Sequence, residues 1–114
     1  MDQTLFALPI LPGKTAAARA FLAELEGERK GQYAASEGKL GLTKEVWAIQ
    51  AGPQGDLYVV YFAGESIAEA FRKFAASHDA FDVWFKERVK ETTGADLNTP
   101  PPGPMSEILS DFQA

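Results

Sequence analysis

The chain contains no cysteine among its 114 residues and only one histidine. Without cysteine it can form no disulfide, no thiolate nucleophile and no thiolate metal site. A single histidine would leave carboxylates to supply almost every ligand of a metal ion, and no EF-hand spacing occurs. The sequence therefore predicts a fold that rests on packing, with no metal site and no cofactor.

Basic clusters and long apolar runs are missing as well. Eleven Lys and Arg stand against sixteen Asp and Glu, and the basic residues are scattered, which leaves no electrostatic footprint for a nucleic acid. No segment approaches the roughly 20 apolar residues that span a bilayer. The apolar stretch near the N-terminus is broken by Pro9, which is unlike a signal peptide. We expect a cytoplasmic protein that binds neither nucleic acid nor membrane.

What the chain does have is an ordinary globular composition. Hydrophobic residues make up 46% and charged residues 24%, values close to the average for a folded domain. A chain of this length typically buries one core. We therefore expect residues 1–114 to form a single domain.

The first half of the sequence predicts a strand followed by an interrupted helix. Residues 5–11 are apolar and precede Pro12 and Gly13, and Pro9 favours an edge position in a sheet. Thr15 is a plausible N-cap for a helix with an apolar stripe formed by Ala18, Phe21, Leu22 and Leu25. Four glycines between 27 and 41 predict that the helix weakens or restarts before it ends near Gly41.

Two strands joined by a short turn should follow. Residues 44–50 alternate, with Val46 and Ala48 on one face and Glu45, Trp47 and Ile49 on the other. Residues 57–63 are strongly β-forming and apolar throughout. The turn-rich stretch between these two segments predicts that they pair antiparallel.

The second half predicts two helical segments and a last strand. Ser66 and Glu69 have the spacing of a capping box, and Ser77 or Asp79 could cap a second segment that Gly94 ends in the left-handed conformation. The apolar stripes of these segments are Ile67, Ala70, Phe71 and Phe74, then Phe81, Trp84, Phe85 and Val89. Residues 98–104 form a proline-rich spacer, and residues 105–113 alternate as a short final strand would.

The resulting order, βαββαβ, predicts an α+β, ferredoxin-like fold. This order gives a four-stranded antiparallel sheet with both helical segments on one face. Two strands are apolar on both sides, so the second face needs a cover. The same face of another copy would supply it in a homodimer. The alternative is that residues such as Tyr58 or Tyr61 simply stand exposed.

These features resemble the dimeric α/β-barrel superfamily of ferredoxin-like proteins, which includes antibiotic-biosynthesis monooxygenases and muconolactone isomerases. Residues 12–25, 41–50 and 77–97 are similar to segments of a small bacterial family within it. The resemblance implies the dimeric barrel fold. It specifies a chemistry much less well, because the superfamily hosts several unrelated reactions and also haem binders.

His78 is a candidate proton shuttle because the usual pKa of histidine, about 6.5, lies near neutral pH. The structural alternative is that His78 hydrogen-bonds Asp79 or the chain end at a helix junction. The superfamily adds a third possibility, that His78 holds a haem.

Glu45 and Trp47 should share a face of one strand and could line a cavity between the sheet and the helices. A buried Glu45 needs a partner, and Lys14, Arg29 and Arg88 are available, so a structural ion pair competes with a catalytic role. The other pocket candidates are Tyr33, Glu37, Tyr61 and Trp84.

The sequence thus leaves three functions open. The first is the binding of a small molecule in a pocket between sheet and helices. The second is a cofactor-independent monooxygenase or isomerase with His78 as proton shuttle and Glu45 as an orienting group. The third is a structural homodimer module without a ligand.

Overall fold

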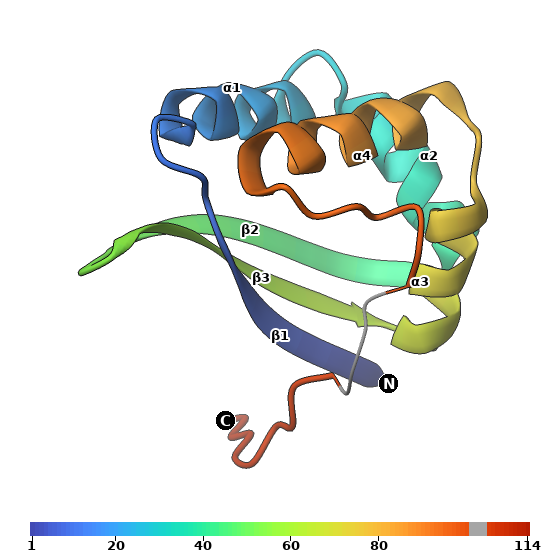
Figure 1. The fold of residues 1–114 in the computed structure, drawn as a ribbon. Helices are drawn as coiled ribbons and strands as arrows, with labels where there is room; N and C mark the ends of the chain where they lie inside the picture. Colours follow the sequence, from blue (N-terminus) through green and yellow to red (C-terminus); the bar gives the residue numbers. More distant parts are fainter. Residues whose placement is uncertain (101–104) are drawn as a thin grey trace.

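The computed structural model describes residues 1–100 and 105–114, and its helices all cover one face of an antiparallel sheet (Figure 1). The sheet has three strands in the order β1-β3-β2. The elements are β1 (Asp2–Pro9), α1 (Thr15–Glu26), α2 (Lys30–Leu40), β2 (Leu42–Gly52), β3 (Gly55–Gly64), α3 (Ile67–Ala76) and α4 (Ala80–Thr93). The α+β class and the placement of the helices on one face are as the sequence predicts.

Strand β3 lies at the centre of the sheet and pairs antiparallel with both neighbours. Val60 of β3 stands opposite Phe6 of β1 and Trp47 of β2. The pairing of β2 with β3 confirms the predicted hairpin. Pro9 is the last residue of β1 and the sheet order makes β1 an edge strand, where a missing N–H is tolerated.

The helical region between β1 and β2 divides as its glycines predict. Helix α1 stops at Gly27, α2 begins at Lys30, and Gly41 ends α2 in the left-handed conformation with φ 73°. The predicted N-cap is wrong by one residue, because Lys14 occupies the cap position. The Thr15 hydroxyl instead donates to Asp56 Oδ2 at 2.6 Å, a contact that ties the start of α1 to the β2–β3 hairpin.

The capping box at the start of α3 is half correct. Ser66 Oγ accepts a hydrogen bond from the Glu69 backbone N–H at 3.2 Å. The Glu69 carboxylate accepts from the Arg72 guanidinium rather than from the Ser66 backbone, because Arg72 lies one turn further along the same face. The end of α4 agrees with the sequence, with Gly94 at φ 80°.

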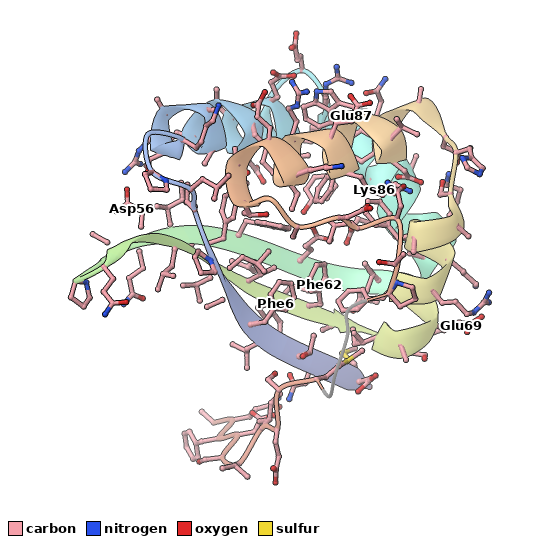
Figure 2. The ribbon with its side chains drawn as sticks, viewed as in Figure 1. Phe6, Asp56, Phe62, Glu69, Lys86 and Glu87 are labelled. Atoms are coloured by element: carbon pink, nitrogen blue, oxygen red, sulfur yellow. The ribbon has the colours of Figure 1, made fainter. Side chains whose placement is uncertain are left out.

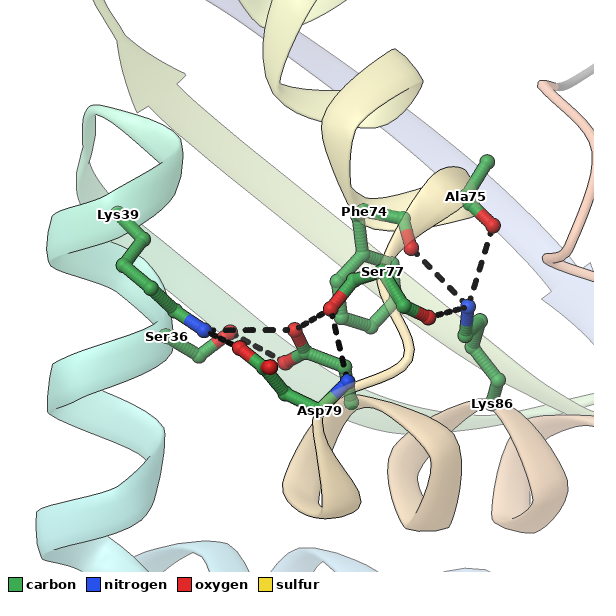
Figure 3. Close-up of polar contacts among 8 residues, drawn as sticks. Ser36, Lys39, Phe74, Ala75, Ser77, Asp79 and Lys86 are labelled. Carbon is green, nitrogen blue, oxygen red and sulfur yellow. Dashed lines mark hydrogen bonds and ion pairs between the residues drawn. The ribbon is translucent and has the colours of Figure 1, made fainter.

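A buried carboxylate joins three helices at the α3–α4 junction (Figure 3). Asp82 is 1% exposed and accepts from the hydroxyls of Ser36 and Ser77, both at 2.6 Å. Ser77 therefore bonds Asp82 rather than capping α4 through its side chain. Asp79 occupies the N-cap position without a side-chain cap bond and pairs with Lys39.

The side chain of Lys86 on α4 reaches the C-terminal end of α3 (Figure 3). The residue is 4% exposed, and its ammonium donates to the carbonyls of Phe74, Ala75 and Ser77 at 3.1, 3.2 and 2.9 Å. The Phe74 carbonyl also accepts the Ser77 N–H at 3.1 Å, and the other two carbonyls lie where the hydrogen-bond ladder of the helix ends. One buried cation thus donates to three carbonyls at the end of α3.

The predicted fourth strand is not formed, because residues 105–114 adopt no regular secondary structure. Ser106 Oγ, rather than a backbone carbonyl, accepts the Leu5 N–H on the free edge of β1 at 3.0 Å. Gln3 Nε2 donates to Asp111 Oδ2 at 2.7 Å, so the segment still lies beside β1 (Figure 1). Of the predicted spacer 98–104, residues 101–104 lie outside the described part of the chain.

The sheet face opposite the helices carries apolar side chains. Leu5 and Val46 are each 43% exposed and stand on either side of Tyr61 in the register, and Val59 is half-buried two residues before Tyr61 on the same face. None of the described helices lies over this face (Figure 1). In the described part of the chain, no helix combines the length and the apolar character that crossing a membrane requires.

Candidate functional site

A cavity of about 720 Å³ lies between the sheet and the helices. Aromatic side chains from strands and helices make up much of its wall. They are Phe6, Tyr33, Trp47, Phe62, Phe71, Phe74, Phe81 and Phe85. The segment after α4 contributes Ala95, Leu97 and Pro100 to the same wall, and Figure 1 shows this segment running between the helices and the sheet.

Two stacked phenylalanines mark the floor of the cavity. The rings of Phe6 on β1 and Phe62 on β3 lie 5.7 Å apart, and Phe71 on α3 meets Phe62 edge-on at 5.2 Å. Figure 2 shows Phe6 and Phe62 on the side of the sheet that faces the helices. These contacts form because alternate residues of a strand point to the same face.

Four polar side chains enter this apolar space from α2 and β2. Tyr33 and Glu37 are one turn apart on α2, and Glu45 and Trp47 are two residues apart on β2. Both spacings place each pair on one face of its element. Gly41, between α2 and β2, reverses the chain and brings the two pairs to the same part of the cavity wall.

Glu45 accepts a hydrogen bond from the Trp47 indole N–H at 2.6 Å. The expected ion pair is absent: none of the ion pairs found among residues 1–100 and 105–114 involves Glu45. Arg29 instead pairs with Glu24 at 3.0 Å and lies 4.0 Å above the Trp84 ring, while Arg88 contacts its neighbour Glu87. An indole donor rather than a cation therefore partners this carboxylate.

The environment raises the pKa of two of these groups. Burial, together with a hydrogen bond to Glu45 and the negative charge of Glu45, raises the pKa of Glu37 to about 10. Burial, and after it the charge of and hydrogen bond to Glu45, raises the pKa of Tyr33 well above its usual value. At neutral pH, Glu37 and Tyr33 are therefore protonated donors, while Glu45 accepts the Trp47 N–H.

A second, smaller cavity of about 230 Å³ adjoins the same residues. Tyr33, Glu45 and Trp47 line both cavities, while Leu22, Leu25, Glu26 and Val46 line only the smaller one. These three side chains thus form a partition. The Glu45 carboxylate can be approached from both sides of it.

Two residues predicted to line the pocket lie elsewhere. Tyr61 is on the opposite sheet face, where its hydroxyl donates to Gln3 at 2.6 Å. Trp84 packs against Phe21 and Phe81 at 5.5 and 5.7 Å and lines neither cavity. Both corrections follow from a face assignment that single-strand and single-helix patterns leave open.

His78 is exposed in the short connection between α3 and α4 and lines neither cavity. This position counts against a proton shuttle or a haem ligand inside the cavity. Among residues 1–100 and 105–114, no group of three or more His, Asp or Glu could hold a metal ion.

The sequence reasoning missed the aromatic walls supplied by β1 and α3. The sequence predicts Phe71 as part of an apolar helix stripe, and it gives no individual role to Phe6 or Phe62. Thr4, Phe6 and Leu8 alternate along β1 and all line the cavity. The alternation of residues along β1 and β3 would have placed Phe6 and Phe62 on the helix-covered face if the pairing register of the strands had been known.

No protein-family model matches the sequence, and no curated protein matches it. The structure is similar to that of tetracenomycin F2 cyclase from Streptomyces glaucescens, described as a type-II polyketide cyclase. The TM-score is 0.56 at 16% sequence identity, over 100% of this chain and 99% of that chain. At this identity the similarity concerns the fold, and the expected resemblance is confirmed at that level.

Proposed function

We propose that the protein binds a small, neutral and largely aromatic molecule in the 720 Å³ cavity. The single observation that carries this proposal is the cavity itself, whose volume lies within the range of about 300 to 1,000 Å³ typical of ligand sites. Such sites combine apolar walls with a few convergent polar groups. Here the aromatic residues supply the walls, and α2 and β2 supply the polar groups.

The chemistry of the polar groups narrows the ligand. Tyr33 and Glu37 offer hydrogen-bond donors, and Glu45 offers an acceptor. A ligand carboxylate would face the negative charge of Glu45 with no paired cation beside it, which is unfavourable in an apolar site. Ketones and phenols with two or more fused rings fit these requirements. The similarity in fold to a polyketide cyclase supports a ligand of this kind.

The direct test measures the binding of two- to four-ring aromatic ketones and phenols by thermal shift and by tryptophan fluorescence. Naphthoate, the carboxylate counterpart of naphthol, is the control ligand. We expect neutral compounds to raise the melting temperature and naphthoate to leave it unchanged.

Two variants on one helix locate the binding site. Ala68 and Ala76 are both exposed on α3, but only Ala68 lines the cavity. Ala68→Trp should weaken binding about tenfold or more by filling the space, because a lost cavity contact surface of ring size is worth at least ~1.4 kcal/mol. Ala76→Trp should bind as the wild type does. Equal binding by the two variants would show that the ligand does not bind in this cavity.

We also propose that the protein is a homodimer through the sheet face opposite the helices. Leu5, Val46 and Val59 make this face apolar, and a flat self-complementary sheet face suits a twofold interface. A second copy could cover the whole face at once, which the short segment 105–114 beside β1 does not.

The other functions considered from the sequence have less support. Proton transfer by His78 would require the imidazole to reach the ligand, and His78 is exposed outside both cavities. A purely structural dimer module gives no reason for carboxyl groups that line an apolar cavity, since partly desolvated carboxyl groups cost stability. The absence of binding by any neutral ligand of the panel would nevertheless favour the structural module.

A further inference from the structure

Glu37 and Glu45 form a carboxyl pair that the sequence analysis did not connect. They come from different elements, α2 and β2, and both line the 720 Å³ cavity. Within the described residues, no ion pair involves either of them, and the charge of Glu45 contributes to the raised pKa of Glu37. Two neighbouring carboxyl groups in an apolar cavity favour holding one proton between them, because two adjacent negative charges repel.

The surroundings make the two carboxyl groups unequal. Glu45 accepts the Trp47 indole N–H at 2.6 Å, which occupies one of its oxygens with a donor. Among the described residues no such donor reaches Glu37, and burial beside the charge of Glu45 raises its pKa to about 10. The shared proton therefore belongs to Glu37. A pair of titratable groups whose environments drive them apart in this way is a pattern of acid–base sites.

We propose that Glu45 and Glu37 act as general base and general acid in a keto–enol proton shift on the neutral aromatic ketone that the cavity binds. This inference rests on the proposed binding function and assigns a reaction to the same cavity. It replaces His78 by two carboxyl groups as the residues that move protons.

The reaction is balanced without an oxidant, reductant or cofactor. The Glu45 carboxylate takes a proton from the carbon next to the carbonyl, and the electrons of that C–H bond form a C=C bond. The π electrons of the carbonyl move to its oxygen, which takes the proton of Glu37. The product is the enol, with Glu45 protonated and Glu37 ionised, so the total charge is unchanged.

The site can return to its starting state internally. Because Glu37 and Glu45 line the same cavity, the proton gained by Glu45 can pass back to Glu37 once the enol leaves. The Tyr33 hydroxyl stays protonated and can donate to the oxygen where negative charge develops, which is the role of an oxyanion donor.

The experiment follows hydrogen–deuterium exchange at the carbon beside the carbonyl of 2-tetralone in D₂O, by proton NMR. This neutral bicyclic ketone exchanges each time it passes through its enol. We expect the wild-type protein to accelerate exchange above the buffer rate. Glu45→Gln should lower the accelerated rate by roughly 10²- to 10⁴-fold, the usual contribution of a general base.

Matched variants separate chemistry from folding and charge. Glu37→Gln keeps a neutral donor but no transferable proton, and should slow exchange with binding retained. Glu87→Gln removes a carboxylate from the outer side of α4, away from the cavity (Figure 2), and should exchange at the wild-type rate. Thermal melting of each variant checks that it is folded.

Binding of 2-tetralone, measured by tryptophan fluorescence, distinguishes the two proposals. If the wild type binds 2-tetralone and accelerates exchange, and Glu45→Gln loses this acceleration, both proposals are supported. Binding with exchange at the buffer rate, or with equal exchange in wild type and Glu45→Gln, overturns the acid–base pair and leaves the binding function standing. If neither 2-tetralone nor any other member of the neutral panel binds, both proposals are wrong.

Discussion

The Trp47 indole N–H and the Glu45 carboxylate meet across 2.6 Å on one face of β2. This contact lies within the partition between the two cavities, and Trp47 also packs edge-on against Phe21 and Tyr58 at 6.0 and 5.1 Å. The indole therefore has two functions: it fills the core and it supplies the donor for a buried carboxylate.

A double-mutant cycle should reveal the hydrogen bond separately from the packing. Trp47→Phe removes the donor and some volume, and Glu45→Met removes the acceptor at similar length. Hydrogen bonds to charged groups contribute about 1.5–3 kcal/mol, so we expect a coupling free energy of at least ~1 kcal/mol in urea unfolding. A coupling near zero would mean that the indole stabilises the protein through packing alone.

The protonation of Glu37 predicts a pH-dependent difference in stability. In the folded protein Glu37 keeps its proton up to about pH 10, whereas in the unfolded chain it loses the proton near the usual glutamate pKa of about 4.3. The folded state thus binds more protons between these values, and its stability falls as pH rises through this range.

Glu37→Gln removes this dependence because glutamine does not titrate. As pH rises from 5 to 8, we expect the melting temperature of the variant to increase relative to that of the wild type by roughly 4 °C or more. Comparing two proteins at each pH cancels the titration of groups distant from Glu37. A constant difference across this range would show that Glu37 is ionised in the folded protein.

Substitution of Lys86 should cause a large loss of stability, although the sequence alone suggests an exposed lysine at this position. Its ammonium donates to three carbonyls at the end of α3. Lys86→Met keeps the stem but leaves these carbonyls with fewer partners, so we expect the free energy of unfolding to fall by about 2–4 kcal/mol. Lys90→Met, an exposed change on the same helix, should cost under about 0.5 kcal/mol.

The proposed dimer predicts a specific response to a charge on the outer sheet face. Wild-type protein should elute as a dimer in size-exclusion chromatography with light scattering at micromolar concentration. Val46→Asp should produce monomers because two copies of the new charge would meet at the interface. Ala34→Asp, an exposed change on α2, should remain dimeric. A monomeric wild type would contradict the proposal.

Local patterns in the sequence predicted most of the secondary structure. The interruption at Gly27, the end of α2 at Gly41 and the β2–β3 hairpin all depend on residues close to one another in the chain. The face shared by Glu45 and Trp47 follows from alternation alone, and the turn shared by Tyr33 and Glu37 follows from helical periodicity.

The errors concern relations between distant segments. Nothing near Tyr61 shows which face of β3 the helices cover, and nothing near Trp84 shows whether it faces α1 or the cavity. The alternation of residues 105–113 resembles that of a strand, but Ser106 supplies a side-chain acceptor to Leu5 where a backbone ladder would be needed. The pair of Glu37 with Glu45 required the α2–β2 turn to be known.

That turn has a consequence for how the site forms and varies. Glu37 and Glu45 lie four residues before and four after Gly41, so a short loop closure brings them together, and closing a short loop costs little chain entropy. The walls that would select a ligand come from β1, α3 and the segment after α4, which are distant in the chain. Substitutions in those walls could change which molecule is accepted while the proton-moving pair is preserved within one continuous peptide.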